Sequence, residues 1–331
     1  MSVDVLKQAV ERFSAMRVAV VGDLMLDAYT WGSARRISPE APVPVVTAER
    51  ENNCLGGAGN VMRNIVTLGG RALAYGVLGD DPDGGVVRKM LESYGIAHGM
   101  VLTDKTRKTT RKQRILAGSQ QLLRIDFEDV GDLADDMRDQ LVAPLLAAIR
   151  GGEVDAVLFE DYGKGVLSGE LVQTVVDAAN ASGVITALDP KPGNLAPVRG
   201  ITVMKPNRGE AYAMSGLTEE RGAAGLEAVA DRIRKDWEVE QLLISLAAQG
   251  LALFRPDRKP VYIPTRAREV FDVSGAGDTL ISTYTLAVAS GSDPEVAAAV
   301  ANIAAGVVVG KVGTVTVTKE ELLKAIEDGG E

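Results

Sequence analysis

Five short apolar runs, each followed by polar residues and a segment of helical period, constrain the fold of this chain more than any other feature. The runs are Val18 to Val21, Ala156 to Phe159, Val184 to Leu188, Ile201 to Met204 and Leu242 to Ser245. Continuous apolar strands that alternate with helices are typical of a parallel sheet buried on both faces. The pattern therefore predicts an α/β fold with a mostly parallel central sheet. Ligands of such sheets bind beyond the carboxyl ends of the strands, where these polar residues gather.

Two stretches, residues 29–51 and 100–127, depart from this pattern and are strand-like. The first contains Pro42 and Pro44, and the second contains a hairpin turn at Ala117-Gly118-Ser119. We expect them to form a small separate β layer that covers the site as a lid, pairs with another subunit, or does both, because uncovered strand edges invite pairing. No linker of biased composition divides the chain, so we expect residues 1–331 to form one domain.

Composition argues against several classes of partner. The 331 residues carry a net charge of −9, and an acidic protein offers no broad surface to nucleic acid or to a membrane. The longest apolar tract, Val296 to Val309, is shorter than the roughly 20 residues that span a bilayer. The N-terminal residues lack a signal-peptide pattern, and the single cysteine, Cys54, cannot form an internal disulfide. We therefore expect a cytoplasmic protein with neither a nucleic-acid nor a membrane partner.

Two glycine clusters each precede a helical segment. They are Gly56-Gly57-Ala58-Gly59-Asn60 and Asp272-Val-Ser-Gly-Ala-Gly-Asp278-Thr279. Glycines let the backbone approach a ligand closely, and the amides of a starting helix attract phosphate oxygens, with Asp278 in the first helical turn. A plain turn is the alternative for either cluster alone. The Walker pattern GxxxxGK[ST] and the dinucleotide pattern GxGxxG are both absent from the sequence. We therefore do not expect phosphate binding by either of these motifs.

Together the two clusters resemble the signatures of the ribokinase-like (PfkB) family of carbohydrate kinases. Asn207-Arg208-Gly209-Glu210 resembles a third family element, Asn-x-x-Glu, and the resemblance extends from about Val18 to Glu321. It implies a three-layer α/β sandwich with a small β lid, and an enzyme that uses ATP and Mg²⁺ to phosphorylate a sugar. A nucleotide-binding regulator without turnover is the alternative from another class, which the complete Gly-Ala-Gly-Asp element disfavours.

Four further runs resemble the branch of this family that phosphorylates D-glycero-β-D-manno-heptose 7-phosphate. They are Gly22–Asp27, Arg36–Val45, Gln120–Glu128 and Ala304–Thr314. That branch makes the 1,7-bisphosphate by acting at the anomeric O1, on the route to ADP-heptose and lipopolysaccharide. The resemblance implies a homodimer, and a separate adenylyltransferase, because a chain with one histidine lacks the HxGH motif of the fused form. A family member with another acceptor, such as fructose 1-phosphate, ribose or a nucleoside, is the closest alternative.

The resemblance also assigns the residues of phosphoryl transfer. Asp278 is implied to take the proton from the acceptor hydroxyl, and the amides of Gly275, Ala276 and Gly277 to bind the transferred phosphoryl group. Asn207 and Glu210 are implied to organise Mg²⁺ through water, with a helix cap as the alternative for this pair. Asp272 is implied to adjoin a loop for a monovalent cation, which makes activation by potassium a hypothesis.

Substrate contacts follow from the resemblance in the same way. On the sugar side it implies Asp27 and Asn60 with the backbone of Gly56 and Gly57, and Asp23 is a further candidate. The acceptor phosphate needs a cation, and six lie between Lys105 and Arg114. Because side chains alternate along a strand, only half of these can face the site. The candidates are Arg111 and Arg36, with Lys164 and Lys191 behind them.

On the nucleotide side, several residues fall where the family holds ATP. These residues are Ser245, Gln249, Gly250 and Asn302, together with Asn207, Gly275 and Gly277.

Overall fold

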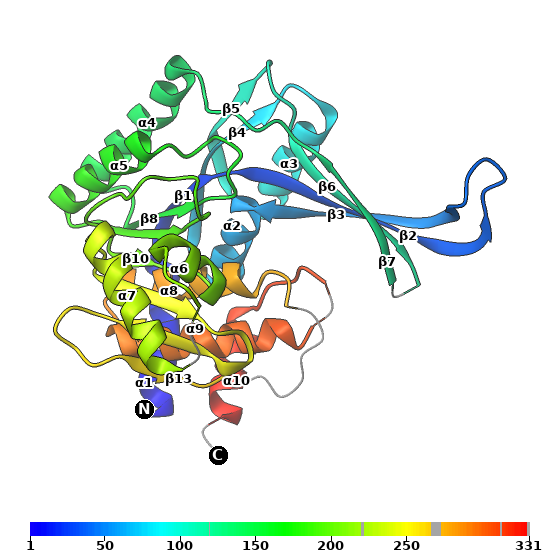
Figure 1. Cartoon of the computed structure of the whole chain (residues 1–331). Coiled ribbons are helices and arrows are strands. Elements are labelled where there is room, and N and C mark those ends of the chain that lie inside the picture. Colours follow the sequence, from blue (N-terminus) through cyan, green and yellow to red (C-terminus); the bar gives the residue numbers. More distant parts are fainter. Residues whose placement is uncertain (119, 220–221, 266–272, 312, 330–331) are drawn as a thin grey trace.

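The computed structural model describes residues 1–118, 120–219, 222–265, 273–311 and 313–329 (Figure 1). Within these residues a central sheet runs in the order β13-β12-β11-β10-β9-β8-β1-β4-β5. Its strands are β1 (Arg17–Gly22), β4 (Arg71–Gly79), β5 (Ala97–Asp104), β8 (Ala156–Glu160), β9 (Ile185–Asp189), β10 (Val203–Met204), β11 (Gln241–Ser245), β12 (Leu251–Phe254) and β13 (Val261–Ile263). The described pairings are parallel, except those of β12 with β11 and with β13. The expected α/β fold with a mostly parallel sheet is confirmed.

Helices cover both faces of this sheet, because its strands are apolar on both sides. In β1, Val18 and Val20 belong to one hydrophobic core, whereas Ala19 and Val21 belong to the other. The first core is closed by α1 (Val3–Glu11), α2 (Ala58–Thr67), α3 (Pro82–Ser93), α8 (Ala276–Ala289), α9 (Pro294–Val309) and α10 (Lys319–Asp328). The second core is closed by α4 (Asp135–Arg150), α5 (Gly169–Ser182), α6 (Arg208–Ser215) and α7 (Ala223–Trp237). The result is a three-layer sandwich.

The apolar tract noted in the sequence forms most of α9, which packs in the first core. Two short 3-10 turns, η1 (Arg12–Ala15) and η2 (Ala247–Gln249), complete the described helical elements. Among the described residues, none of the helices combines the length and the hydropathy needed to cross a membrane.

A second, smaller sheet has the order β3-β2-β6-β7. It consists of β2 (Leu24–Ile37), β3 (Pro44–Gly57), β6 (Thr110–Ala117) and β7 (Gln120–Phe127), and we call it the lid sheet. The pairing of β6 with β7 is antiparallel, as expected for a hairpin at Gly118. The far ends of β2 and β3 project from the body of the molecule (Figure 1).

The limits of the lid sheet differ from those expected. Met100 to Asp104 belong to β5 of the central sheet, where they pair with β4 and bury Val101. Conversely, the first two strands of the lid sheet begin at Leu24 and end at Gly57, so they extend beyond the 29–51 stretch at both ends. The expectation was wrong there because Leu24 and Leu55, at the base of the lid sheet, are buried in the first core and look like central-strand residues.

Candidate active site

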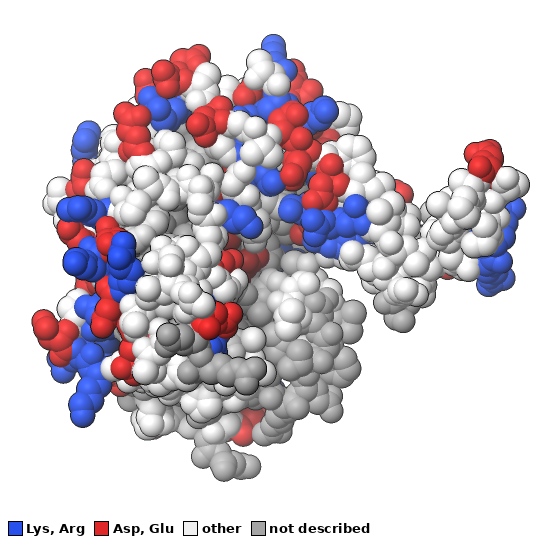
Figure 2. Space-filling model, viewed as in Figure 1, with Lys and Arg blue, Asp and Glu red and all other residues white. Residues whose placement is uncertain are grey.

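Two cavities open beside the carboxyl ends of the central strands and meet at two shared residues, Asp278 and Tyr162. The first has a volume of about 160 Å³ and lies against the lid sheet. The second has a volume of about 690 Å³ and lies over the ends of β8, β9 and β11. Figure 2 shows a hollow in this face, with acidic side chains in its floor and Lys and Arg beside it. A group bound in either cavity can therefore reach Asp278.

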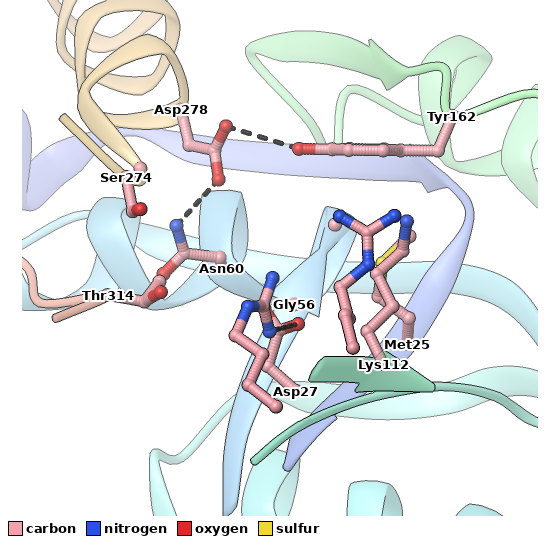
Figure 3. A pocket seen from close by; sticks show the side chains of 13 residues that line it. Met25, Asp27, Gly56, Asn60, Lys112, Tyr162, Ser274, Asp278 and Thr314 are labelled. Carbon is pink, nitrogen blue, oxygen red and sulfur yellow. Dashed lines mark hydrogen bonds and ion pairs between the residues drawn. The ribbon is translucent and has the colours of Figure 1, made fainter. Parts of the chain in front are cut away.

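Asp278 is the third residue of α8, a helix that follows Gly275 in the left-handed conformation (φ 78°). Asn60 Nδ2 donates a hydrogen bond of 2.6 Å to its Oδ2, and the Tyr162 hydroxyl lies 3.4 Å from its Oδ1. Figure 3 shows the carboxylate between these two side chains. Burial raises the pKa of Asp278, and the hydrogen bond from Asn60 opposes that rise. Asp278 in turn raises the pKa of Tyr162 well above its ordinary value, so the hydroxyl keeps its proton and remains a donor.

Buried polar contacts between α2 and α8 hold Asn60 beside Asp278. Asn64 donates through Nδ2 to the Asn60 carbonyl at 2.9 Å and accepts at Oδ1 from the Thr279 hydroxyl at 2.7 Å. Asn60 itself is 1% exposed, and its Oδ1 has no hydrogen-bond partner among the described residues. The amide is thus oriented by the protein and keeps one acceptor atom for a ligand.

The sugar-side candidates Asp27, Gly56, Gly57 and Asn60 all line the first cavity. Asp27 lies on β2, is 7% exposed, and accepts a hydrogen bond of 2.6 Å from Arg114 Nη1. A Cβ added at Gly56 would lie 2.7 Å from Asp27 Oδ2. A side chain at that position would displace Asp27, which explains part of the first glycine cluster.

Three cations line the first cavity: Lys112, Arg114 and Arg124. The predicted Arg111 lies on the opposite face of β6, where its guanidinium pairs with Asp83 at 3.4 Å and covers the Phe127 ring at 4.2 Å. The prediction that Arg111 binds the acceptor phosphate is therefore wrong. Two other cations of the same run, Lys112 and Arg114, do line the first cavity.

The register of the lid sheet explains that error. Asp27 pairs with Lys112 and Tyr29 with Arg114, so alternate residues of β6 share the face of Asp27. The other candidate for the acceptor phosphate, Arg36, lies exposed near the far end of β2 and lines neither cavity. The structure therefore does not support this prediction.

Lys164 and Asp23 hold a loop instead of lining the first cavity. Lys164 Nζ pairs with Glu128 at 2.8 Å. The Asp23 carboxylate, 2% exposed, accepts hydrogen bonds from the backbone amides of Tyr162 (2.9 Å), Lys164 (3.0 Å) and Val166 (3.3 Å). Burial raises the pKa of Asp23, and these amides oppose the rise. Asp23 thus fixes the loop that carries Tyr162, and the prediction that it contacts the sugar is corrected.

Most of the nucleotide-side candidates line the second cavity. These are Ser245, Gly250, Asn302, Asn207 and Gly277, whereas Gln249 does not line it and Gly275 lines the first cavity. The metal candidate Glu210, the catalytic candidate Ala276 and the phosphate candidate Lys191 also line the second cavity. Asn207 and Glu210 form a capping box at the start of α6, with bonds of 2.9 Å and 2.7 Å between each side chain and the other's backbone amide. The pair is therefore both a helix cap and part of the cavity wall.

Sequence reasoning did not single out the acidic group where the cavities meet. Oxygens of Glu160, Asp189 and Asp278 all lie within 4.8 Å of one another. Burial raises the pKa of Glu160 and of Asp189, and neighbouring carboxylates add to both shifts. The only signal in the sequence was that Glu160 and Asp189 end apolar strands.

One buried cation, Lys205, accompanies this acidic group. It follows β10, is 4% exposed, and its Nζ lies 2.8 Å from Asp189 Oδ2. Burial alone would lower the pKa of Lys205, but Asp189 raises it overall, so the ammonium stays charged. A Cβ added at Gly277 would lie 3.2 Å from Lys205 Nζ. Positive charge therefore lies directly beside the start of α8.

The proposed ligand of a monovalent cation, Asp272, lies outside the described residues.

Comparison with known proteins gives a consistent result. A model described as pfkB family carbohydrate kinase matches residues 15–321. The bifunctional protein HldE of Caulobacter sp. (strain K31) is 43% identical over 320 residues, which make up 97% of this chain and 64% of that relative. The chain thus spans less than two thirds of the length of this relative.

Solved structures are similar in fold. Arabidopsis thaliana ribokinase complexed with ribose and ATP has a TM-score of 0.71 at 22% identity, covering 94% of this chain and 98% of that one. Phosphofructokinase-2 from Escherichia coli in complex with potassium has a TM-score of 0.76 at 19% identity, covering 95% and 98%. At such identities the likeness concerns the fold.

Proposed function

We propose a specific activity from one premise: this chain belongs to the pfkB family of carbohydrate kinases. It is a sugar kinase, and the activity proposed is transfer of the γ-phosphoryl group of ATP to the anomeric O1 of D-glycero-β-D-manno-heptose 7-phosphate. The observation that carries the proposal is the meeting of two cavities at Asp278, one of them lined by three cations. The product would be the 1,7-bisphosphate.

Asp278 is the proposed base of this reaction. The acceptor hydroxyl loses its proton to the Asp278 carboxylate while its oxygen bonds to the γ-phosphorus, and the bond from that phosphorus to the bridging oxygen breaks to release ADP. Asn60 holds the carboxylate and can accept a sugar hydroxyl at its Oδ1. The amides of Gly275, Ala276 and Gly277, with Lys205 beside them, are suited to the charge on the transferred group.

The acceptor phosphate is the proposed partner of Lys112, Arg114 and Arg124. The Asp27 carboxylate is the only described acidic side chain that lines the first cavity besides Asp278, and Arg114 already pairs with it. Arg124 likewise pairs with Asp126 at 2.8 Å, which leaves Lys112 as the one of these three cations without an ion pair among the described residues. Its charge is one that an unphosphorylated sugar does not require. The runs that resemble heptose 7-phosphate kinases narrow the acceptor to that sugar phosphate.

The carboxylates of the second cavity suit Mg²⁺, the cation that the family implies. Glu210, Asp189 and Asn207 offer the oxygen ligands that this hard cation prefers, either directly or through water. When bound there, Mg²⁺ supplies charge neutralisation for the nucleotide phosphates. Potassium activation stays a hypothesis, and equal rates in sodium and potassium buffers would count against it.

We propose that the protein works as a homodimer through the lid sheet. Exposed apolar residues of its strands support this, namely Ile37, Leu123, Ile125 and Phe127, together with Val43 in the connection between β2 and β3. Sedimentation that shows only monomer would contradict it. In the pathway, the product would pass to an adenylyltransferase, consistent with lipopolysaccharide-precursor synthesis in the cytoplasm.

A panel of acceptors tests the proposal. ADP release is measured with heptose 7-phosphate, fructose 1-phosphate, ribose and a nucleoside, and ³¹P NMR locates the new phosphate. We expect heptose 7-phosphate to give the highest kcat/KM, with the new phosphate on O1. A preference for another acceptor would favour a different kinase of this family. No turnover with any acceptor would favour the non-catalytic regulator.

A further inference from the structure

A tyrosine without a role in the proposed reaction lies where the two cavities meet. Tyr162 lines both cavities, and its hydroxyl lies 3.4 Å from Oδ1 of Asp278. The other carboxylate oxygen, Oδ2, accepts the hydrogen bond of 2.6 Å from Asn60 Nδ2. Figure 3 shows the Tyr162 hydroxyl and the Asn60 amide directed at different oxygens of the carboxylate. The protein therefore holds the proposed base at both oxygens.

A carboxylate that is held at one oxygen only can still rotate. The terminal torsion of an aspartate side chain is broad, so a bond to Oδ2 alone leaves the plane of the Asp278 carboxylate free to turn. A second donor at Oδ1 fixes that plane, because the two donors come from separate elements: Asn60 from α2 and Tyr162 from the loop after β8. Each oxygen keeps a second lone pair for an acceptor hydroxyl, and a general base must direct such a lone pair at the proton that it removes. Orientation of Asp278 is thus a requirement of the reaction that the Tyr162 hydroxyl can meet.

The loop that carries Tyr162 is anchored by two buried carboxylates. Asp23 accepts three amide hydrogen bonds from it. Asp161, which is 6% exposed, accepts from the Gly163 amide at 2.9 Å and from the Lys191 amide at 3.2 Å, so the loop is also tied to the segment after β9. Gly163 has a φ of 66°, in the left-handed region that favours glycine. The loop therefore holds the Tyr162 hydroxyl at Asp278 without help from a bound sugar.

The donor at Oδ1 is neutral, which suits a base. The charge of Asp278, together with burial, raises the pKa of Tyr162 well above its ordinary value, so the hydroxyl stays protonated at neutral pH. A Lys or Arg side chain in its place would form an ion pair with Asp278 and lower the affinity of the carboxylate for a proton. A distance of 3.4 Å is long for a bond from a hydroxyl to a carboxylate, and catalytic hydrogen bonds of this kind often shorten once substrates are bound. The tyrosine hydroxyl thus orients the carboxylate and leaves it able to accept a proton.

We propose that Tyr162 is a positioning residue, whose hydroxyl fixes the plane of the Asp278 carboxylate so that a lone pair faces the acceptor hydroxyl. Its effect on turnover rests on the proposed function, because Tyr162 acts through Asp278, whereas the hydrogen bond between the two side chains does not. Loss of the hydroxyl alone should slow the chemical step and leave both substrates bound, since the ring that lines the cavities is retained. Slow chemistry with intact binding is the result that distinguishes orientation of the base from contact with a substrate.

Single-turnover kinetics of Tyr162→Phe test the proposal. We expect the rate of phosphoryl transfer to fall about tenfold or more, as for the loss of one hydrogen bond to a charged group, while the KM of the acceptor changes less than about threefold. Tyr284→Phe is the matched control, because it removes a tyrosine hydroxyl on α8, the helix of Asp278, that donates to Gln241 at 2.8 Å. Tyr284 lines neither cavity, so its variant should lower Tm and leave the transfer rate unchanged. Thermal melts verify that both variants fold.

A spectroscopic measurement tests the hydrogen bond without any turnover. The full-length chain contains seven tyrosines, and labelling with ¹³Cζ-tyrosine allows the Tyr162 signal to be identified by its absence from Tyr162→Phe. This signal should shift in Asp278→Asn, because a charged acceptor is replaced by a neutral amide. The signal of Tyr284, assigned in the same way, should stay in place.

Several outcomes would overturn the proposal. It fails if Tyr162→Phe transfers the phosphoryl group at the unaltered rate, if Tyr284→Phe slows the transfer as much, or if the Tyr162 signal does not respond to Asp278→Asn. A rise in the KM of the acceptor with an unaltered transfer rate would also refute it, since Tyr162 would then be a substrate contact. If the unaltered protein phosphorylates no sugar while the Tyr162 signal responds to Asp278→Asn, the proposed kinase activity fails and the contact that orients Asp278 is supported. The two claims can therefore fail separately.

Discussion

Replacing Asp23 distinguishes a structural carboxylate from a sugar ligand. The carboxylate accepts three backbone hydrogen bonds from the loop that carries Tyr162. Asp23→Ala leaves three amides without this acceptor, that of Val166 buried and those of Tyr162 and Lys164 partly buried. Asp23→Asn offers one oxygen and one competing NH₂ group. We therefore expect both variants to lose stability, with alanine the worse of the two.

The magnitude follows from the number of bonds. An unsatisfied buried donor costs about 1–3 kcal/mol, so Asp23→Ala should lower the free energy of unfolding by about 3–5 kcal/mol once the loop relaxes. In Asp23→Asn, one oxygen can keep the bonds to Tyr162 and Lys164 while the NH₂ group opposes the Val166 amide. Burial raises the pKa of Asp23, which means that the protein disfavours its charge, so losing that charge partly compensates. A loss of about 1–2 kcal/mol is expected for asparagine.

Thermal and urea denaturation measure these losses. For a chain of this length 1 kcal/mol corresponds to about 1.5 °C, so Asp23→Ala should lower Tm by roughly 5–7 °C. Asp80→Asn, a change of the same type at an exposed residue that follows β4, is the control and should not move Tm. If both Asp23 variants melted with the unaltered protein and only the KM of the acceptor rose, the loop interpretation would be refuted.

Three further predictions concern the site itself. Asp278→Asn should lower kcat about 10²–10⁴-fold, as expected for loss of a general base, while calorimetry shows ATP affinity retained; near-normal turnover would remove Asp278 from its role. Lys112→Met should raise the KM of a phosphorylated acceptor about 10–100-fold, the equivalent of one charged hydrogen bond, whereas Arg111→Met on the opposite face of β6 should not; equal effects in steady-state kinetics would contradict the assignment. Burial raises the pKa of Glu160 well above its ordinary 4.5, so the unfolded chain releases this proton at lower pH than the folded protein does. The contribution of this proton to the free energy of unfolding is fully present below the ordinary pKa. As pH rises from there toward the folded pKa, that contribution falls by at most about 1.4 kcal/mol per pH unit. In metal-free buffer, the free energy of unfolding of Glu160→Gln should therefore rise relative to that of the unaltered protein as pH rises. If urea denaturation showed the same pH dependence for both proteins, the raised pKa of Glu160 would be excluded as a determinant of stability.

Local patterns allowed part of the site to be predicted. The glycine clusters lead into α2 and α8, because the need for a glycine at a helix start is a property of a few adjacent residues. Asn207 and Glu210 were likewise identifiable, since a capping box requires only a spacing of three residues.

Contacts between distant segments could not be predicted in this way. Choosing Lys112 over Arg111 requires the pairing of β6 with β2, which no local pattern reveals. The convergence of Glu160, Asp189 and Lys205 depends on the order of β8, β9 and β10 in the sheet. Asp23 looked like a ligand because its three partners lie about 140 positions along the chain.

The division of the molecule into two sheets has a consequence for how such proteins diversify. The first cavity takes Met25, Asp27, Lys112, Arg114 and Arg124 from the lid sheet, whereas the second is built over the ends of the central strands. Under the proposed function, acceptor recognition and donor recognition would thus be encoded by separate stretches of the gene that converge on Asp278. Substitutions in the lid strands would then change which sugar is accepted, while the residues of the second cavity are inherited unchanged. A chimera that carries the lid strands of a relative with a different acceptor should therefore take on the acceptor preference of that relative.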